Sequence, residues 1–106
     1  LFNTGWDKRW GTDSYFGDYP HITEEVADYL ISMGKKGVGL DVIGIDPIRD
    51  TNLTIHKKLF KETEIVVIEN LTNLSLIGDD LFTFCALLIK FHNSDGAPIR
   101  AIAILD

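Results

Sequence analysis

The chain contains a single cysteine, Cys85, so it cannot form an internal disulfide. Cys85 lies in the apolar run over residues 82–91, which predicts a buried thiol in a protein of a reducing compartment, the cytoplasm. That run has ten residues and is interrupted by Thr83 and Lys90, whereas a membrane-spanning helix needs about 20 apolar residues. The sequence therefore predicts neither a disulfide framework nor a transmembrane helix.

Clusters of basic residues are also missing. The formal net charge is −6, and lysine and arginine occur in runs no longer than two. Phosphate backbones and anionic membranes are bound by clustered Lys and Arg, so neither nucleic acid nor a membrane surface is expected as a partner.

Several catalytic signatures are absent as well, namely G-x-S-x-G, Walker A, G-x-G-x-x-G and C-x-x-C. A nucleophilic cysteine is not expected, because Cys85 is predicted to be buried. The chain also starts without methionine, and Leu1 leads straight into LFNTGW, which is typical of a strand already under way. We therefore expect the sequence to be the C-terminal part of something longer.

Residues 4–22 are rich in glycine and aromatic side chains and follow neither a helical nor a strand period. Loops of this length are usually functional or disordered, and the aromatics favour an ordered one. A helix is expected next, with Thr23 as its N-cap, Glu24 and Glu25 in its first turn, and Gly34 at its end. Its inward face is expected to hold Val26, Leu30 and Met33.

The rest of the chain alternates strands and helices before it ends in two strands. The uniformly apolar segment 81–91 is typical of a strand at the centre of a sheet. This order predicts an α/β fold, with a mixed sheet and flanking helices. The expected elements are a strand over 37–46, a helix over 54–62, and strands over 65–69, 81–91 and 98–105. The expected inward residues are Ile55, Leu59 and Phe60 of the helix and Leu71, Leu74 and Leu76 of the connection that follows the strand 65–69.

His56 and Glu69 are thirteen residues apart, near the start of the expected helix and at the end of the next strand. From His56 the expected helix carries the chain about 10 Å away, at about 1.5 Å per residue. The strand returns by about 13 Å at about 3.3 Å per residue, so both side chains should lie along one edge of the sheet. Asp41 and Asp46 reach the same edge, which is where open α/β sheets usually bind ligands.

One histidine and up to three carboxylates suit a divalent cation such as zinc or manganese. Acidic residues at strand ends also cap helices and turns in any α/β protein. The spacing alone leaves both interpretations open.

Five short motifs occur in a recognisable order. The first joins TGW to ITEEVADYL, and the other four are GLDVIGID, IHKKLF, VVIENLTNL and DGAPIRAIAIL. This order resembles the C-terminal half of the family named Putative cyclase. Its members are metal-dependent hydrolases that include the bacterial kynurenine formamidases (arylformamidases) and isatin hydrolase. The resemblance implies a swivelling β/β/α fold, in which residues 1–106 are the C-terminal part of a single domain.

The resemblance also implies a centre of one or two zinc or manganese ions. In the family an N-terminal H-x-G-T-H-x-D-x-P-x-H motif and a downstream His and Glu hold the metal. His56 and Glu69 fit the downstream pair, with Glu69 as a metal-bridging carboxylate. Asp41 and Asp46 fit the G-x-D-x-x-S-x-D element and are expected to support the site.

The sequence departs from the family pattern at two places. Gly44 stands where the family usually has serine, so any role of that hydroxyl is missing here. The N-terminal histidine motif is absent, and with it the general acid/base, so no catalytic residue is expected in this chain. Two metal ligands remain, fewer than the three of a typical catalytic zinc site.

The resemblance implies hydrolysis of a small-molecule amide or cyclic amide, such as an arylformamide of tryptophan catabolism, by a metal-activated water. Trp6 and Trp10 could wall an aryl pocket or could instead pack their loop onto the domain. The family also implies a homo-oligomer, and residues 1–106 alone are expected to be inactive. The alternatives are a non-catalytic remnant or assembly module and a domain that binds a small molecule through the aromatic loop.

Overall fold

The computed structural model describes residues 1–62 and 64–105. The chain divides into two compact units, Leu1–Ser75 and Leu76–Asp106. Strands pair in parallel in the first unit and antiparallel in the second, which confirms the mixed α/β class. The strands form two separate two-stranded sheets, however, and not the single sheet that we predicted.

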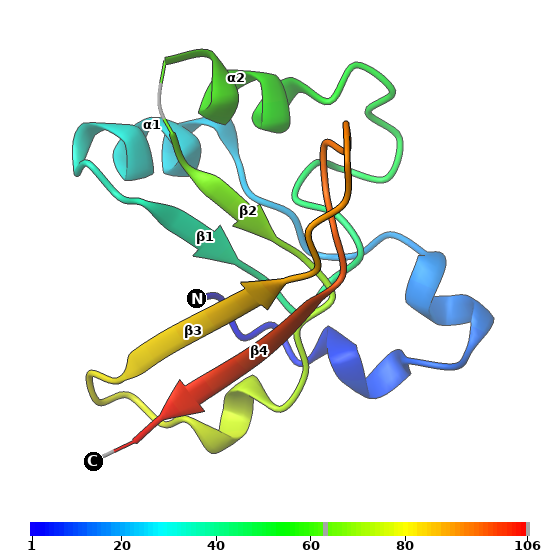
Figure 1. Cartoon of the computed structure of the whole chain (residues 1–106). Coiled ribbons are helices and arrows are strands. Elements are labelled where there is room, and N and C mark those ends of the chain that lie inside the picture. The colour runs from blue at the N-terminus through cyan, green and yellow to red at the C-terminus, as the bar shows by residue number, and fades with distance from the viewer. Residues whose placement is uncertain (63, 106) are drawn as a thin grey trace. The chain divides into compact units, whose positions relative to one another are not determined.

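The first unit contains two short parallel strands, β1 (Gly37–Gly39) and β2 (Val66–Ile68). Helix α2 (Thr54–Glu62) lies between them in the chain, so the three elements form a β-α-β crossover. Figure 1 shows β1 and β2 side by side with the same direction. Phe2 extends the pairing through a parallel bridge to Leu40.

Helix α1 (Glu24–Ser32) begins at its predicted N-cap, where the Thr23 hydroxyl accepts a hydrogen bond from the Val26 N–H at 3.4 Å. Ala27 and Leu30 of this helix are buried. Met33 is 53% exposed, so its predicted inward position is wrong. The helix ends one residue earlier, at Ser32, and the helical period no longer decides where Met33 points.

Helix α2 spans the predicted residues, and Ile55 and Leu59 are buried as expected. Phe60 is 53% exposed and corrects our prediction. It follows Ile55 by five positions, which places it about 140° away around the helix. Leu76 is also exposed, at 75%, because it ends the short 3-10 helix η3 (Leu74–Leu76) two positions after the buried Leu74.

The core of the first unit lies between the two helices, β1 and the segments beside them. Two 3-10 helices, η1 (Trp6–Arg9) and η2 (Asp13–Phe16), give the aromatic segment an ordered backbone, as predicted. The buried cluster consists of Tyr19, Ile22, Ala27, Leu30, Val38, Leu40, Val42, Ile45, Ile55, Leu59 and Ile65.

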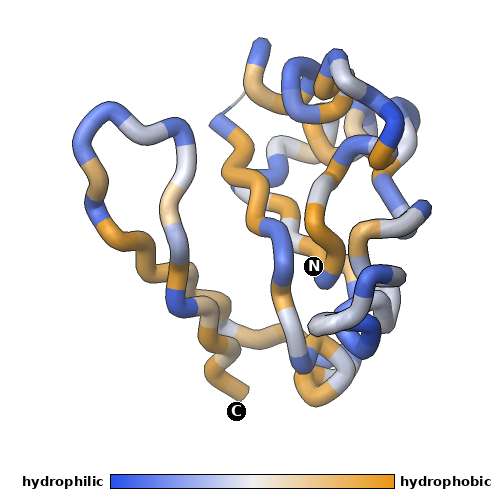
Figure 2. The backbone as a smooth tube through the Cα atoms, turned by 90° about the vertical axis from the view of Figure 1, so that its right-hand side faces the viewer, coloured by the Kyte–Doolittle hydropathy of each residue, from blue (hydrophilic) through white to orange (hydrophobic). Residues whose placement is uncertain are grey.

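The second unit is a hairpin of β3 (Thr83–Leu88) and β4 (Ile99–Ile104), paired from Thr83↔Ile104 to Leu88↔Ile99. Figure 2 shows that its strands are largely apolar and that the segment joining them is hydrophilic. Within the described chain β3 pairs with β4 alone, so it is not the central strand that we predicted. Cys85 is half-buried and not fully buried, which corrects the prediction of a buried thiol.

Within the described ranges, no helix is long and apolar enough to cross a membrane.

Candidate metal and active site

Asp46 fixes the side chain of His56 at the start of α2. Its Oδ1 accepts a hydrogen bond from the Ile55 N–H at 2.5 Å, and its Oδ2 accepts one from the His56 N–H at 3.3 Å, so the carboxylate caps the helix. The same Oδ2 lies 2.5 Å from Nδ1 of His56. A carboxylate on Nδ1 sets the ring orientation and leaves Nε2 to bind a further partner.

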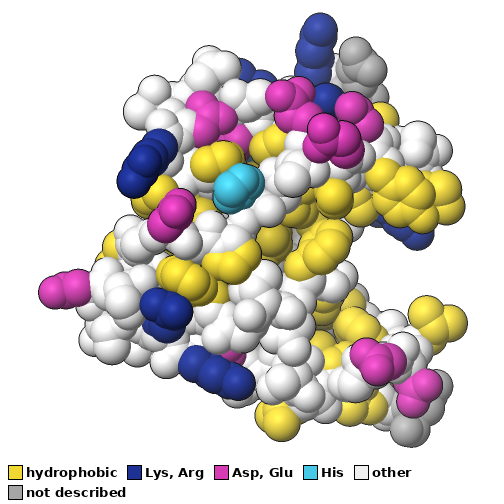
Figure 3. Space-filling view, turned by 180° about the vertical axis from the view of Figure 1, so that it is seen from behind, with side chains coloured by type: hydrophobic (Ala, Val, Ile, Leu, Met, Phe, Trp, Pro, Cys, Tyr) yellow, Lys and Arg dark blue, Asp and Glu magenta, His cyan; other side chains and the backbone are white. Residues whose placement is uncertain are grey.

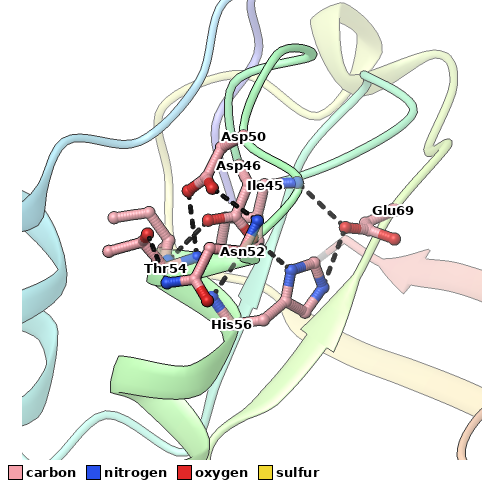
Figure 4. Close-up of polar contacts among 8 residues, drawn as sticks. Ile45, Asp46, Asp50, Asn52, Thr54, His56 and Glu69 are labelled. Carbon is pink, nitrogen blue, oxygen red and sulfur yellow. Dashed lines mark hydrogen bonds and ion pairs between the residues drawn. The ribbon is translucent and has the colours of Figure 1, made fainter.

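Glu69 lies beside the other ring nitrogen of His56, Nε2. Its Oε1 accepts a hydrogen bond from the Ile45 N–H at 2.9 Å and lies 3.3 Å from Nε2 of His56. Figure 4 shows the imidazole between the carboxylates of Asp46 and Glu69. The side chains of His56 and Glu69 are 23% and 27% exposed, whereas that of Asp46 is 4% exposed. The spacing argument correctly placed His56 beside Glu69, and the structure leaves this pair accessible to a ligand.

Asn70 turns the chain directly after Glu69. β2 ends at Ile68, one residue short of the predicted strand, and Asn70 follows Glu69 with a left-handed φ of 58°, which asparagine adopts more readily than most residues. The Asn70 N–H donates to the Val42 carbonyl at 2.8 Å, and its Oδ1 accepts a hydrogen bond from the Tyr15 hydroxyl at 2.6 Å. This turn ties the aromatic segment to the residue that follows Glu69.

A second carboxylate stabilises the turn that leads into α2. Asp50 accepts hydrogen bonds from the backbone of Asn52 at 2.8 Å and of Thr54 at 3.0 Å. Hydrogen bonds from the side chain and backbone of Thr54 lower the pKa of Asp50 below its ordinary 3.8. Between them, Leu53 has a φ of 54°, which costs a residue with a Cβ about 1–2 kcal/mol. The capping bonds offset this strain and hold the start of the helix in place.

Asp41 makes its contacts elsewhere, at the beginning of the chain. Its carboxylate is fully buried and accepts hydrogen bonds from the Thr4 N–H at 3.0 Å, the Thr4 hydroxyl at 2.7 Å and the Gly5 N–H at 2.7 Å. Asp41 therefore supports the segment that leads into η1, and it does not contact His56 or Glu69.

The two tryptophans of the aromatic segment differ in their surroundings. Trp6 packs against the core, donates its Nε1–H to the Tyr15 carbonyl at 2.9 Å, and has the Arg9 guanidinium 4.0 Å from its ring centroid. Trp10 is 69% exposed and contacts Tyr15 edge to face at 5.1 Å. Packing of the loop therefore occupies Trp6, and Trp10 offers an accessible aromatic surface.

Two aromatic contacts of the site were not predicted from the sequence. The Phe60 ring lies 5.7 Å from the His56 ring at an interplanar angle of 62°, a contact that the i, i+4 spacing on a helix could have indicated. The Tyr19 hydroxyl occupies the space beside Gly44, and a Cβ on that glycine would lie 2.7 Å from it. No periodic pattern in residues 4–22 pointed to Tyr19.

Tyr15 and Tyr19 are both held in their protonated form. Burial raises the pKa of each above its ordinary 10.0. The negative charges of Asp41, Asp7 and Glu69 raise the pKa of Tyr15 further, and those of Glu69 and Asp46 raise that of Tyr19. Both phenols are therefore hydrogen-bond donors at neutral pH.

Replacing Tyr15 with phenylalanine should lower the free energy of unfolding by about 1 kcal/mol at neutral pH, because Asn70 loses its hydrogen bond. The folded-state pKa of Tyr15 is raised, so its contribution is complete below pH 10.0 and is lost as the pH rises through the folded value. Urea unfolding at about pH 7 and about pH 11 measures both effects. A difference between wild type and Y15F that grows at alkaline pH would contradict this assignment.

The donor set can be compared with what a metal needs. An imidazole Nε2 next to a carboxylate is a ligand pair that zinc and manganese both accept, and Asp46 on Nδ1 is the usual support for such a histidine. Among residues 1–62 and 64–105, however, no group of three or more His, Cys, Asp or Glu could hold a metal ion. A catalytic zinc usually takes three protein ligands and a water. His56 and Glu69 are therefore the right types of ligand for zinc or manganese, and they are suitably oriented. They supply only part of the coordination shell of a catalytic metal.

Comparison with known proteins adds independent information. A family model named Putative cyclase matches residues 1–47. A kynurenine formamidase of Bacillus anthracis is 34% identical over 83 residues, covering 78% of this chain and 39% of that protein. An uncharacterized protein of Methanocaldococcus jannaschii is 38% identical over 106 residues, covering 99% of this chain and 53% of that protein. The chain thus spans about half or less of the length of these relatives.

Proposed function

Since this chain belongs to the Putative cyclase family, we propose that the protein that contains it is a metal-dependent hydrolase of an amide or cyclic amide. The observation that carries the proposal is His56, whose ring is fixed by the buried Asp46 and whose Nε2 lies beside the accessible Glu69. The similarity to kynurenine formamidases favours an arylformamide substrate, such as N-formylkynurenine in tryptophan catabolism.

His56 and Glu69 are the residues of this chain that would hold a zinc or manganese ion. The chemistry supplied by such an ion is a nucleophilic water at neutral pH and a polarised scissile carbonyl. Asp46 keeps Nε2 of His56 directed at the ligand, and the Ile45 N–H keeps Oε1 of Glu69 in place. These two contacts preorganise the pair, so little reorganisation is needed when a ligand binds.

Residues 1–106 alone are proposed to be inactive, because two ligands make an incomplete shell for a catalytic metal. The whole protein is proposed to act in the cytoplasm and as a homo-oligomer. Exposed apolar side chains support the association, and Figure 3 shows hydrophobic side chains at the surface of one face. The exposed apolar side chains of the hairpin include Leu87, Leu88, Ile102 and Ile104.

One observation favours a second candidate, a non-catalytic remnant or assembly module. The described residues bring together only two potential ligands, which is the expected state of a site that has lost its chemistry. This candidate predicts that the purified full-length protein retains neither zinc nor manganese.

Elemental mass spectrometry of the full-length protein and an assay with N-formylkynurenine separate the two candidates. We expect bound zinc or manganese and hydrolysis that is lost with EDTA and restored by either ion. Residues 1–106 expressed alone should show no hydrolysis above the buffer rate. Hydrolysis by the full-length protein that survives complete removal of metal would contradict the proposal, and so would a protein free of both metal and activity.

A further inference from the structure

Gly44 and Tyr19 are matched in shape. A Cβ placed on Gly44 would lie 2.7 Å from the Tyr19 hydroxyl and 3.5 Å from Cζ of the same ring. The first distance is shorter than any ordinary contact of a Cβ atom, so even alanine at position 44 would have to displace the phenol. The hydroxyl occupies its position because residue 44 has no side chain.

The Tyr19 hydroxyl also retains access to solvent. Tyr19 is 6% exposed and belongs to the core cluster, and its hydroxyl makes no hydrogen bond within residues 1–62 and 64–105. Yet every fully buried side-chain oxygen or nitrogen in that part of the chain has a hydrogen-bond partner. The hydroxyl therefore keeps a small exposure to solvent, although Tyr19 as a whole is buried.

The backbone places this hydroxyl next to the candidate site. The Ile22 N–H donates to the Ile45 carbonyl at 3.2 Å, and the Ile45 N–H donates to Glu69 at 2.9 Å, so the Tyr19 segment, residues 44–46 and Glu69 are in direct contact. Burial raises the pKa of Tyr19 above its ordinary value, and the charges of Glu69 and Asp46 raise it further. The Tyr19 hydroxyl thus lies next to Gly44, one residue before the Ile45 N–H that holds Glu69.

We propose that the Tyr19 hydroxyl is a substrate-binding hydrogen-bond donor that orients a carbonyl oxygen beside Glu69, and that Gly44 provides the space for it. The inference deepens the proposed function and rests on it for the identity of the reaction. A rigid phenol held by the core can donate in one fixed direction at little entropic cost. The substrate class that it selects is a carbonyl compound, and an otherwise similar amine without the carbonyl would lose this contact.

The full-length protein with Tyr19→Phe tests the role of the hydroxyl. We expect kcat/KM for formanilide, a simple arylformamide, to fall by about 10- to 100-fold, as the loss of one well-placed hydrogen bond predicts. The metal content and the urea midpoint should stay at their wild-type values, because the hydroxyl has no partner in the described chain. Tyr29→Phe is the matched control, since it removes an exposed hydroxyl from α1 and should leave kcat/KM unchanged.

A double-mutant cycle tests the role of Gly44. Gly44→Ala should displace the phenol and lower kcat/KM by a similar factor, but it should have a much smaller effect in the Tyr19→Phe background. If G44A and Y19F reduce kcat/KM independently and multiply in the double variant, the proposed link between the two positions is wrong. The Y19F result still decides the role of the hydroxyl if G44A does not fold.

Calorimetric binding of formanilide and of aniline keeps this inference separate from the proposed function. We expect Y19F to weaken formanilide binding by about 10-fold and to leave aniline binding unchanged. If wild type binds formanilide in this Tyr19-dependent way without hydrolysing it, the proposed function fails and the inference stands. If wild type hydrolyses formanilide and Y19F does so equally well, the inference fails and the proposed function stands. If neither binding nor hydrolysis occurs, both are wrong.

Discussion

Replacing His56 with alanine should reduce kcat/KM of the full-length protein by at least about 100-fold and should release most of its zinc or manganese. Loss of a residue that only supports a ligand already costs about 10- to 100-fold in metal affinity or activity, and loss of the ligand itself costs more. Among residues 1–62 and 64–105, His56 is the histidine that lies beside Glu69, and its Nε2 is 3.3 Å from that carboxylate. Metal analysis and steady-state kinetics on the same preparation measure both effects.

Two further variants make this result specific. His92→Ala removes an exposed histidine from the turn between β3 and β4 and should change neither metal content nor kcat/KM. Asp46→Asn keeps the shape of the residue but weakens its hold on Nδ1, so it should fall between wild type and H56A, at about 10- to 100-fold. An H56A protein that is folded, loaded with metal and fully active would show that the site lies elsewhere.

The second large effect concerns stability. Replacing Asp41 with alanine should lower the free energy of unfolding by about 3 kcal/mol or more, because hydrogen bonds to a charged group contribute about 1.5–3 kcal/mol each. Asp41 is fully buried and binds both Thr4 and Gly5, so its removal leaves several donors without an acceptor. Domains of ordinary stability have about 5–15 kcal/mol in total, so the loss should be obvious in urea unfolding.

The matched control for Asp41 is Thr4→Val, which removes one hydroxyl and keeps the branched shape. It removes the 2.7 Å hydrogen bond to Asp41 and the 3.2 Å hydrogen bond that the Thr4 hydroxyl accepts from the exposed Trp6 N–H, but it leaves the two backbone donors to Asp41 in place, so a loss of about 1.5 kcal/mol is expected. If D41A and T4V destabilise the protein equally, the backbone donors contribute little and the carboxylate is not the main anchor of this segment.

The sequence predicted the helices better than the strands, and the reason is local. The N-cap at Thr23 and the limits of α2 depend on neighbouring residues, and both agree with the structure. The strand predicted over residues 37–46 stops at Gly39. Beyond it, the chain follows contacts that no local pattern records, such as the Leu71 N–H on the Leu40 carbonyl.

The candidate site was predictable to a similar extent. The rise of a helix and of a strand was enough to place His56 beside Glu69. The contact of Asp46 with Nδ1 of His56 could not be predicted from the spacing. A carboxylate that caps a helix and one that binds a metal have the same appearance in a sequence. The contact of Tyr15 with Asn70 joins residues 55 positions apart and starts from an aperiodic segment, so it required the structure.

The contacts around His56 also have a consequence for the order of folding. Asp46 and His56 are 10 positions apart, and Ile45 and Glu69 are 24 apart, whereas the contacts of Asp41 with Thr4 span 37 positions. Closing a short loop costs less entropy than closing a long one, and short-range contacts generally form sooner. We therefore expect His56 and Glu69 to be oriented early, before the aromatic segment is held in place, so that the proposed metal site would form while the rest of the chain is still folding.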